Sequence, residues 1–366
     1  MFVENDTDVL LRLGPVYTLL FRGENSLKIW FDADNGPHVL IMRPLAQQFR
    51  ERGHEIVFTA RDRTSTCELL DLYEFTYKKV GGLYGSGMSG KIRGTLGRAV
   101  SLARAMKGGG AQVSFGHGSR ALPIASRLLG VPTVTMYDYE WVDARLFNWF
   151  CRSILLPESV NLERCAEAGI STRKAVLYPG FKEELYLGAG ELDLSIPTDL
   201  GLDADGVHVL LRPPATTAHY HNPEAELILD AILKRLAQEP RVQLVYLPRT
   251  PDQHDLPARA GVARVIIPNK VYDGPSLVAS MDMIISGGGT MTREAAIFGV
   301  PAYSFFRGRS GMVDETLAAE GKLMLIPSPD AVAERLQVVK KQGAVTRPDP
   351  APLVRFICDA IEASAV

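Results

Sequence analysis

The sequence predicts two α/β domains, each built on a parallel β-sheet whose strands alternate with helices. Its 366 residues exceed the usual size of one such domain, so two domains are expected. Strand-like and helix-like patterns alternate along the chain, which is typical of parallel sheets with right-handed crossovers. A stretch with Gly and Pro near the middle has the composition of a linker. We expect these parts: an N-terminal extension at 1–26, a first domain at 27–180, a linker at 181–200, a second domain at 201–345, and a C-terminal helix in 346–366 that packs back toward the first domain.

In the first half, short apolar runs rich in β-branched and aromatic residues mark the strands. We place them at 28–31, 55–59, 75–80, 113–115, 133–136, 154–156 and 176–178. Apolar residues at helical spacing mark the clearest helices, at 39–52, at 64–72 and in a basic segment that ends near 106.

The second half repeats this alternation. We expect strands at 207–211, 242–246, 264–267, 283–286, 301–304 and 323–326. Helices are expected at 224–238, 276–280, 291–298, 312–319, 330–340 and 352–362. Two such domains facing each other would hold a ligand in the cleft between them, at the carboxyl ends of the strands.

Composition excludes several classes of protein. The formal net charge of −2 gives no overall basic field, so we expect no nucleic-acid partner. The four cysteines form no CxxC pair and are typical of reduced thiols in a cytoplasmic protein. There is no apolar run of the length of a transmembrane helix. Acidic residues near the start are wrong for a signal peptide, and we expect residues 1–26 to be a poorly ordered extension.

The most informative segment is 284–295, where an apolar strand pattern stops at three glycines and a helix pattern follows at once. The free N–H groups of a helix N-terminus bind phosphate well. Glu294 lies one turn into the helix, where its carboxylate can accept hydrogen bonds from a sugar. We therefore predict a nucleotide diphosphate site at Ser286, Gly287, Gly288, Gly289, Thr290 and Glu294. The alternative is a purely structural tight turn. Neither a P-loop nor a GxGxxG fingerprint is present, so kinases, ATPases and dehydrogenases are excluded.

Two arginines follow other strands of the second half. Arg212 ends the strand at 207–211, and Arg249 follows the strand at 242–246. Because the carboxyl ends of parallel strands share one edge, both can reach a phosphate at the glycine turn. Each could instead be a solvated surface arginine.

In the first half, the strand at 28–31 leads into Asp32, Asp34, Asn35 and His38. Asp34 and His38 are candidates for orienting or deprotonating an acceptor hydroxyl, and Asn35 for binding it. The structural alternative is that Asn35 caps the following helix. The Asp-x-Asp pattern matches a metal-binding motif of another glycosyltransferase architecture only superficially. We therefore expect no metal here and no cofactor.

Two later strand ends carry further candidates. His117, Ser119 and Arg120 follow the strand at 113–115 and are expected to bind the acceptor. Asp138 and Glu140 follow the strand at 133–136, and either could be the general base. Asp138 could equally cap a helix.

The segment 91–107 predicts a basic helix, with Lys91, Arg93, Arg98, Arg104 and Lys107. Most such helices are solvated. The alternative is contact with an anionic membrane surface or a lipid-linked acceptor, which would place the protein at the inner face of the membrane.

At these residues the chain resembles the GT-B glycosyltransferase superfamily. It is similar to an uncharacterised bacterial and archaeal family of predicted glycosyltransferases over about residues 27–326. The resemblance rests on the segments 30–38, 53–55, 59–62, 116–120, 138–140, 211–214 and 287–295. Relatives include the N-acetylglucosaminyltransferase of peptidoglycan synthesis and the non-hydrolysing UDP-N-acetylglucosamine 2-epimerases. In both, a glycine-rich turn followed by Glu-Ala holds the diphosphate and the ribose, which implies those roles for 286–290 and Glu294.

The resemblance implies a metal-independent glycosyltransferase with a nucleotide diphosphate-sugar donor, which we expect to be UDP-linked. It would move the sugar with inversion to a glycan or lipid-linked acceptor in cell-surface polysaccharide or glycolipid synthesis. One alternative is an epimerase. The epimerases carry an Arg in the first loop, Gly-Asp-Thr after the fourth strand and His-Arg-Arg at the second domain. This chain has Asp34-Asn35, Gly118-Ser119-Arg120 and Leu211-Arg212-Pro213 there, although Glu140 could match one of their carboxylates. The other alternative is a non-catalytic protein that binds nucleotide sugars.

Overall fold

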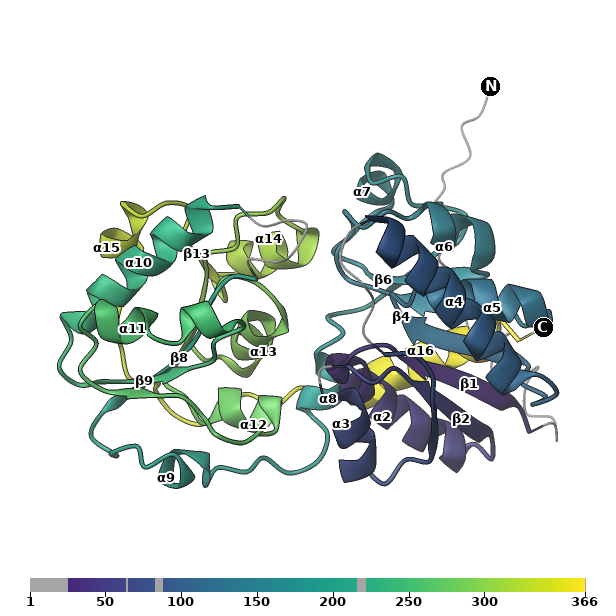
Figure 1. Cartoon of the computed structure of the whole chain (residues 1–366), viewed down its shortest axis with the longest axis horizontal. Helices are drawn as coiled ribbons and strands as arrows, with labels where there is room; N and C mark the ends of the chain where they lie inside the picture. The colour runs from purple at the N-terminus through teal and green to yellow at the C-terminus, as the bar shows by residue number, and fades with distance from the viewer. Residues whose placement is uncertain (1–25, 64, 83–87, 216–221, 366) are drawn as a thin grey trace.

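The structure is a computed structural model that describes residues 26–63, 65–82, 88–215 and 222–365. Apart from Ser26, the expected N-terminal extension lies outside this range. The described chain forms two parallel sheets with strand orders β3-β2-β1-β4-β5-β6-β7 and β10-β9-β8-β11-β12-β13. Figure 1 shows them in two α/β domains side by side, as the alternation of strands and helices predicts.

The first sheet contains β1 (Lys28–Ala33), β2 (Glu55–Ala60), β3 (Tyr77–Lys79), β4 (Val113–His117), β5 (Thr133–Met136), β6 (Ser153–Pro157) and β7 (Ala175–Tyr178). Its helices are α2 (Gly36–Glu51), α3 (Thr66–Leu72), α4 (Met88–Met106), α5 (Ala121–Leu129), α6 (Arg145–Phe150) and α7 (Leu162–Glu167). The order reverses direction between β1 and β4, which creates the switch point where α/β sheets bind ligands.

The second sheet contains β8 (Val207–Arg212), β9 (Val242–Tyr246), β10 (Val265–Ile266), β11 (Met283–Ser286), β12 (Ala302–Ser304) and β13 (Met324–Leu325). Its helices are α10 (Glu224–Ala237), α11 (Leu256–Arg259), α12 (Gly274–Ala279), α13 (Thr290–Phe298), α14 (Met312–Ala319) and α15 (Ala331–Arg335), with a 3₁₀ turn at Pro251–Gln253. Its switch point lies between β8 and β11, next to the glycine turn.

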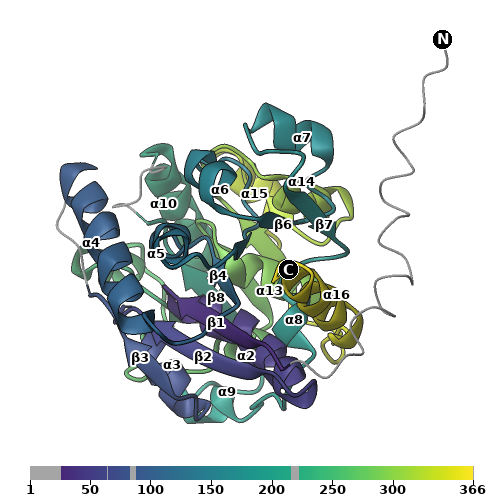
Figure 2. The ribbon, with the colours of Figure 1, turned by 90° about the vertical axis from the view of Figure 1, so that its right-hand side faces the viewer.

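Alternate residues of β1 show that the first sheet is covered on both faces. Phe31 packs with Phe58 and Phe115 on the side of α2. Trp30 points the other way, into the cluster formed with α4 and α5. Since side chains of a strand alternate between faces, α2 and α4 lie on opposite sides of the sheet. Figure 2 shows this separation.

The segment between the domains is folded rather than extended. The range expected as a linker, 181–200, contains α8 (Glu184–Leu187) and α9 (Ile196–Asp199). Leu185, Tyr186 and Leu187 of α8 are buried in an apolar core that includes residues of both domains. The last helix, α16 (Ala351–Glu362), packs against α2 and α8, and Arg52 pairs with Asp359 at 2.7 Å and Glu362 at 2.9 Å.

Some expected boundaries are wrong. The helix expected at 330–340 ends at Arg335, and the strands expected at 264–267 and 323–326 are reduced to two residues each. These strands lie at the two edges of the second sheet, where each has one neighbour to pair with. The basic helix spans Met88–Met106 and ends where expected.

Candidate functional site

The glycine turn joins β11 to α13 on the side of the second domain that faces the first (Figure 1). Gly289 is the N-cap residue of α13, and no side chain forms a capping hydrogen bond there. The first N–H groups of an α-helix have no partner within the helix. The positive end of α13 is therefore presented at the turn, as an anion site requires.

Close contacts leave no room for a side chain at two glycines of this turn, Gly287 and Gly288. A Cβ atom on Gly287 would lie 2.7 Å from the Cα atom of Pro214. A Cβ atom on Gly288 would lie 2.7 Å from the Phe306 ring, and its φ of +108° is in the region that favours glycine. The turn is thus held between the loops that follow β8 and β12.

Arg212 lies directly beside the turn. In the parallel pairing of β8 with β11, Arg212 is the partner of Ser286. Its Nη1 contacts the Met291 sulfur at 3.5 Å, and its buried Nε has no hydrogen-bond partner among the described residues. Burial lowers the pKa of Arg212, although Glu294 opposes this effect. A guanidinium with an unsatisfied donor beside a helix N-terminus is suited to bind a phosphate oxygen.

The other polar groups of the turn shape it. Arg249 donates from Nε to the Pro213 carbonyl at 2.8 Å and from Nη2 to the Gly288 carbonyl at 3.3 Å. The Ser286 hydroxyl donates to the same Gly288 carbonyl at 3.0 Å. Arg249 therefore ties the β8 loop to the glycine turn. Thr290, the first residue of α13, is partly exposed beside it.

Glu294 is buried below the turn and is held from the linker. The Tyr186 hydroxyl of α8 donates to Glu294 Oε1 at 2.8 Å. Burial raises the pKa of Glu294 to about 7, although the hydrogen bond from Tyr186 opposes this effect. The sequence pattern of α8 gave no sign that its tyrosine would meet Glu294.

In the first domain, the end of β1 carries a buried ion pair that the sequence did not reveal. Arg98 of α4 donates to both oxygens of Asp32 at 2.8 Å. Ser119 donates to Asp32 at 2.8 Å, and Thr59 does so at 2.7 Å. The Ser119 hydroxyl therefore donates its hydrogen to Asp32, and that hydrogen is not available to an acceptor substrate. Arg98, expected on a basic helix surface, points inward.

Asp34, His38 and His117 lie together at the edge of this network, where Asp34 is 3.5 Å from Arg98 and 3.4 Å from Arg61. The Asp34 N–H donates to His38 Nδ1 at 3.2 Å, and the rings of His38 and His117 are 4.9 Å apart. Burial lowers the pKa of both rings, that of His117 to about 4, so both are neutral at pH 7. Burial also raises the pKa of Asp34, although Arg98 opposes this effect.

The hydrogen bond to His38 fixes its chemistry. A neutral imidazole carries one hydrogen, and Nδ1 of His38 is an acceptor, so the hydrogen lies on Nε2. His38 can therefore donate a hydrogen bond from Nε2 but cannot take a proton there. This arrangement favours Asp34 over His38 as a base.

Asn35 and Arg120 are placed at helix starts. Asn35 occupies the N-cap position of α2, but its side chain makes no capping hydrogen bond there. Arg120 is the exposed N-cap residue of α5. The predicted N-cap position of Asn35 is therefore confirmed, but the capping hydrogen bond expected from its side chain is wrong.

Asp138, at the end of β5, belongs to a buried charge network across the domain interface. It pairs with Lys182 at 2.5 Å and with Arg293 of α13. Arg293 also pairs with Asp314 at 2.6 Å, and Lys182 pairs with Glu183. Burial opposes ionisation of Asp138, but Lys182 and Arg293 outweigh it and hold its pKa well below its usual range. Such a carboxylate is a weak base.

Glu140 also holds the domains together. It is fully buried, and its Oε1 accepts from the Met312 N–H of α14 at 3.0 Å. Its neighbours act similarly: the Tyr139 hydroxyl donates to the Arg309 carbonyl at 2.9 Å, and Trp141 Nε1 donates to the Ser310 carbonyl at 2.7 Å. The segment that follows β5 therefore forms part of the interface with the second domain.

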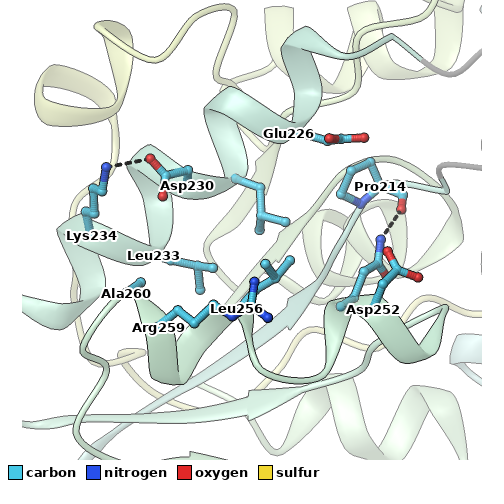
Figure 3. A pocket seen from close by; sticks show the side chains of 11 residues that line it. Pro214, Glu226, Asp230, Leu233, Lys234, Asp252, Leu256, Arg259 and Ala260 are labelled. Carbon is cyan, nitrogen blue, oxygen red and sulfur yellow. Dashed lines mark hydrogen bonds and ion pairs between the residues drawn. The ribbon is translucent and has the colours of Figure 1, made fainter.

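A separate cavity of about 290 Å³ lies between α10 and α11 (Figure 3). Leu229, Leu233 and Leu256 form its apolar part, and Lys234 on its rim pairs with Asp230 at 2.7 Å. It contains none of the site residues expected from sequence. Within the described ranges, no group of three or more His, Cys, Asp or Glu side chains could hold a metal ion. The expectation of metal-free chemistry stays a prediction.

Comparisons with solved structures define the class of fold. The chain is similar to a putative UDP-N-acetylglucosamine 2-epimerase from Listeria monocytogenes, with a TM-score of 0.72, 14% identity, and coverage of 93% of this chain and 96% of that chain. It is similar to S. aureus MnaA, solved with UDP, with a TM-score of 0.69, 16% identity and coverage of 90% and 95%. For Acinetobacter baumannii MurG the TM-score is 0.53, with 16% identity and coverage of 92% and 99%. At these identities the likeness shows the fold, which is GT-B.

The family follows from the sequence comparison. Residues 27–362 match the model described as "Protein of unknown function (DUF354)", and the chain belongs to this family. An uncharacterised protein of Methanocaldococcus jannaschii is 25% identical over 338 residues, which is 90% of this chain and 97% of that protein.

Proposed function

We propose that the protein binds a nucleoside diphosphate-sugar at the turn after β11 and transfers the sugar to an acceptor hydroxyl without a metal. The observation that carries this proposal is Arg212, whose Nε has no partner among the described residues beside the uncapped start of α13. Together they offer the positive charge that a leaving diphosphate needs. Glu294 would accept hydrogen bonds from the ribose.

The acceptor would meet Asp34 and His38 on the first domain. Asp34 would take the proton of the attacking hydroxyl, because part of its side chain is open to solvent and its pKa is raised despite the nearby Arg98 and Arg61. His38 would donate a hydrogen bond from Nε2 to an oxygen of the acceptor or the sugar. Attack on the face opposite the diphosphate would invert the anomeric carbon. His117, Asn35 and Arg120 would contact the acceptor.

The comparisons support UDP as the nucleotide. S. aureus MnaA, to which the chain is similar in fold, was solved with UDP. By the resemblance to the peptidoglycan N-acetylglucosaminyltransferase, the acceptor would be a glycan or a lipid-linked intermediate of cell-surface polysaccharide or glycolipid synthesis, on the cytoplasmic side.

A thermal-shift screen tests the donor site. UDP and UDP-sugars should raise the melting temperature of the wild-type protein, and Arg212→Ala should reduce that shift. Leu227→Ser, which changes an exposed residue of α10, is the control and should leave the shift unchanged. If no nucleoside diphosphate stabilises the wild type, the proposal is wrong.

A second assay tests the acceptor side. With a matched donor and acceptor, Asp34→Asn should lower turnover by about 10²- to 10⁴-fold, the usual contribution of a general base. Its UDP-induced thermal shift should stay that of the wild type. Equal turnover in the two proteins would remove Asp34 from the proposed role.

A UDP-N-acetylglucosamine 2-epimerase is the second candidate, favoured by the higher TM-scores of 0.72 and 0.69 against 0.53 for MurG. Against it, Glu140, the carboxylate that could match an epimerase residue, is buried against α14. NMR of UDP-N-acetylglucosamine incubated without acceptor would show the epimer if this candidate is right. Stabilisation by nucleotides with no turnover in either assay would indicate a non-catalytic binding protein.

A further inference from the structure

Helix α4 exposes an apolar stripe to solvent. Ile92, Leu96 and Val100 are 54%, 51% and 41% exposed. They are spaced four residues apart, so they lie along one side of the helix. Exposed aliphatic residues are normal singly, but a continuous row of them marks an interaction surface.

Basic residues share this side of α4. Arg93 and Arg104 are exposed, as is Lys107 just after the helix. At 100° per residue Lys107 falls within the arc of the apolar stripe, and Arg93 and Arg104 lie about 20° and 40° beyond its edge. No Asp or Glu occurs between Glu74 and Asp138. The surface formed by this stretch is therefore positive, on a chain whose net charge is −2.

Two neighbouring helices extend the surface. α5 packs against α4, and α6 packs against α5 (Figure 2). Leu128 of α5 is 63% exposed beside the exposed Arg127, and Trp149 of α6 is 73% exposed. Asp143, the acidic residue before α6, pairs with Arg145 at 2.7 Å. We call the exposed side of α4, α5 and α6 the basic–apolar face.

We propose that the basic–apolar face binds the surface of an anionic lipid bilayer. Its Arg and Lys side chains would pair with lipid phosphates, and Ile92, Leu96, Leu128 and Trp149 would enter the boundary between headgroups and acyl chains. Tryptophan suits that boundary because its ring is apolar and its N–H is polar. A nucleic acid would use the positive charge but would leave the aliphatic row without a partner. Among the described residues no helix is long and apolar enough to cross a membrane, so the contact would be peripheral.

The proposal does not depend on the transfer reaction. The face is nevertheless joined to the acceptor side of the site, since Arg98 of α4 pairs with Asp32 at the end of β1. An acceptor carried by a lipid would thus be presented near Asp34.

Vesicle binding tests the proposal on the full chain. The protein should sediment with vesicles of phosphatidylglycerol and phosphatidylcholine in equal parts at low salt, and not with phosphatidylcholine alone. Added salt should release it. Trp149 fluorescence should shift to shorter wavelength on binding, and Trp149→Phe should lose that shift, since Trp30 is fully buried and Trp141 is bound to the Ser310 carbonyl at the domain interface.

Matched pairs of variants test whether the basic–apolar face, rather than another part of the surface, binds the vesicles. Arg93→Glu with Arg104→Glu should lower vesicle partitioning by about thirtyfold or more, from the loss of two charges near the surface. Arg355→Glu, an exposed position on α16 behind the sheet, should have no effect. Leu96→Ser should weaken binding, whereas Leu227→Ser on α10 should not. Melting temperatures of all variants verify that they are folded.

Several results would overturn the proposal. They are equal binding to neutral and anionic vesicles, no binding to either, unchanged binding by the folded Arg93→Glu/Arg104→Glu variant, or binding of duplex RNA in place of vesicles. None of them bears on whether UDP binds at the glycine turn, so failure here is distinguishable from failure of the proposed function.

Discussion

The ends of strands β11 and β5 both lie at the domain interface. They differ in how many of their polar groups remain unpaired and can bind a ligand. At the end of β11, no side chain of the described ranges caps the start of α13, and the Nε of Arg212 beside it has no partner in those ranges. At the end of β5, Asp138 is bound by groups of the linker and of the second domain, and Oε1 of Glu140 is bound by the second domain, although its Oε2 has no partner among the described residues. Both ends carry polar groups in the position that α/β proteins use for ligands. The difference shows that a group is available only if nothing on the facing domain has already paired with it.

The strongest test of this contrast is Arg293→Ala. This change removes the partner that the buried Asp138 and the half-buried Asp314 share, and leaves Asp138 with Lys182 alone. We expect the free energy of unfolding to fall by about 3–5 kcal/mol, as when one partner of a buried ion pair is removed. Chemical denaturation measures it. A loss below about 1 kcal/mol, the usual value of an exposed pair, would show that the β5 end does not lock the domains.

Arg212→Ala tests the other strand end. Because Arg212 has few partners within the protein, the free energy of unfolding should change little. Loss of a charge-assisted hydrogen bond to phosphate, worth about 1.5–3 kcal/mol, should weaken UDP binding by about 10- to 100-fold. Calorimetric titration measures the affinity. Arg212→Lys is the informative companion, since it keeps the charge and loses the planar donor pair.

The pH dependence of Glu294 gives a third test. Its pKa is raised by burial from 4.5 to about 7, so the folded state binds more protons than the unfolded state between these values. The free energy of unfolding should therefore fall as pH rises from 4.5 to 7, by up to about 3 kcal/mol for this group. Glu294→Gln should remove that part of the pH dependence. Denaturation curves at pH 5 and pH 8 check it.

The same group should make UDP binding depend on pH in the opposite direction. A carboxylate that accepts hydrogen bonds from the ribose must be ionised, so affinity should fall up to about tenfold per pH unit below pH 7. In Glu294→Gln the affinity should be lower, and only the pH dependence due to the terminal phosphate of UDP, whose second pKa is about 6, should remain. A wild-type affinity that does not change between pH 5 and pH 8 would place the ribose elsewhere.

The smallest expected effect is that of Tyr186→Phe. This change removes the linker hydroxyl that holds Glu294 at 2.8 Å. We expect UDP affinity to fall about fivefold, the value of one neutral hydrogen bond of about 1 kcal/mol. Because that bond lowers the pKa of Glu294, the pH at which affinity declines should move upward. A purely structural role for Tyr186 would lower the melting temperature and leave that midpoint in place.

Much of the fold could be predicted from the sequence because each strand and helix is encoded locally. Phe31 and Trp30 alternate across a buried strand, and three glycines between β11 and α13 announce a turn with close contacts. The edge strands β10 and β13 were overestimated because strand length at an edge depends on one neighbour, which an apolar run does not specify.

The candidate site was predictable in part. The glycine turn and Arg212 were found because helix N-termini and strand ends are features of neighbouring residues in the chain. The roles of Asp138, Glu140 and Ser119 were not, because their partners Arg293, Met312 and Asp32 are far away in sequence. The donor role of His38 likewise depends on one backbone hydrogen bond.

The sequence by itself therefore determined two parallel α/β domains and the glycine turn at 286–290, whose role as an anion site stays a prediction. Periodicity and glycine placement act over a few residues, so they can be recognised without tertiary contacts. Only the tertiary structure decided which charges remain available for a ligand. The pairing of Arg98 with Asp32, of Arg293 with Asp138 and of Tyr186 with Glu294 joins distant segments, and burial of such groups is stable only when each finds its partner.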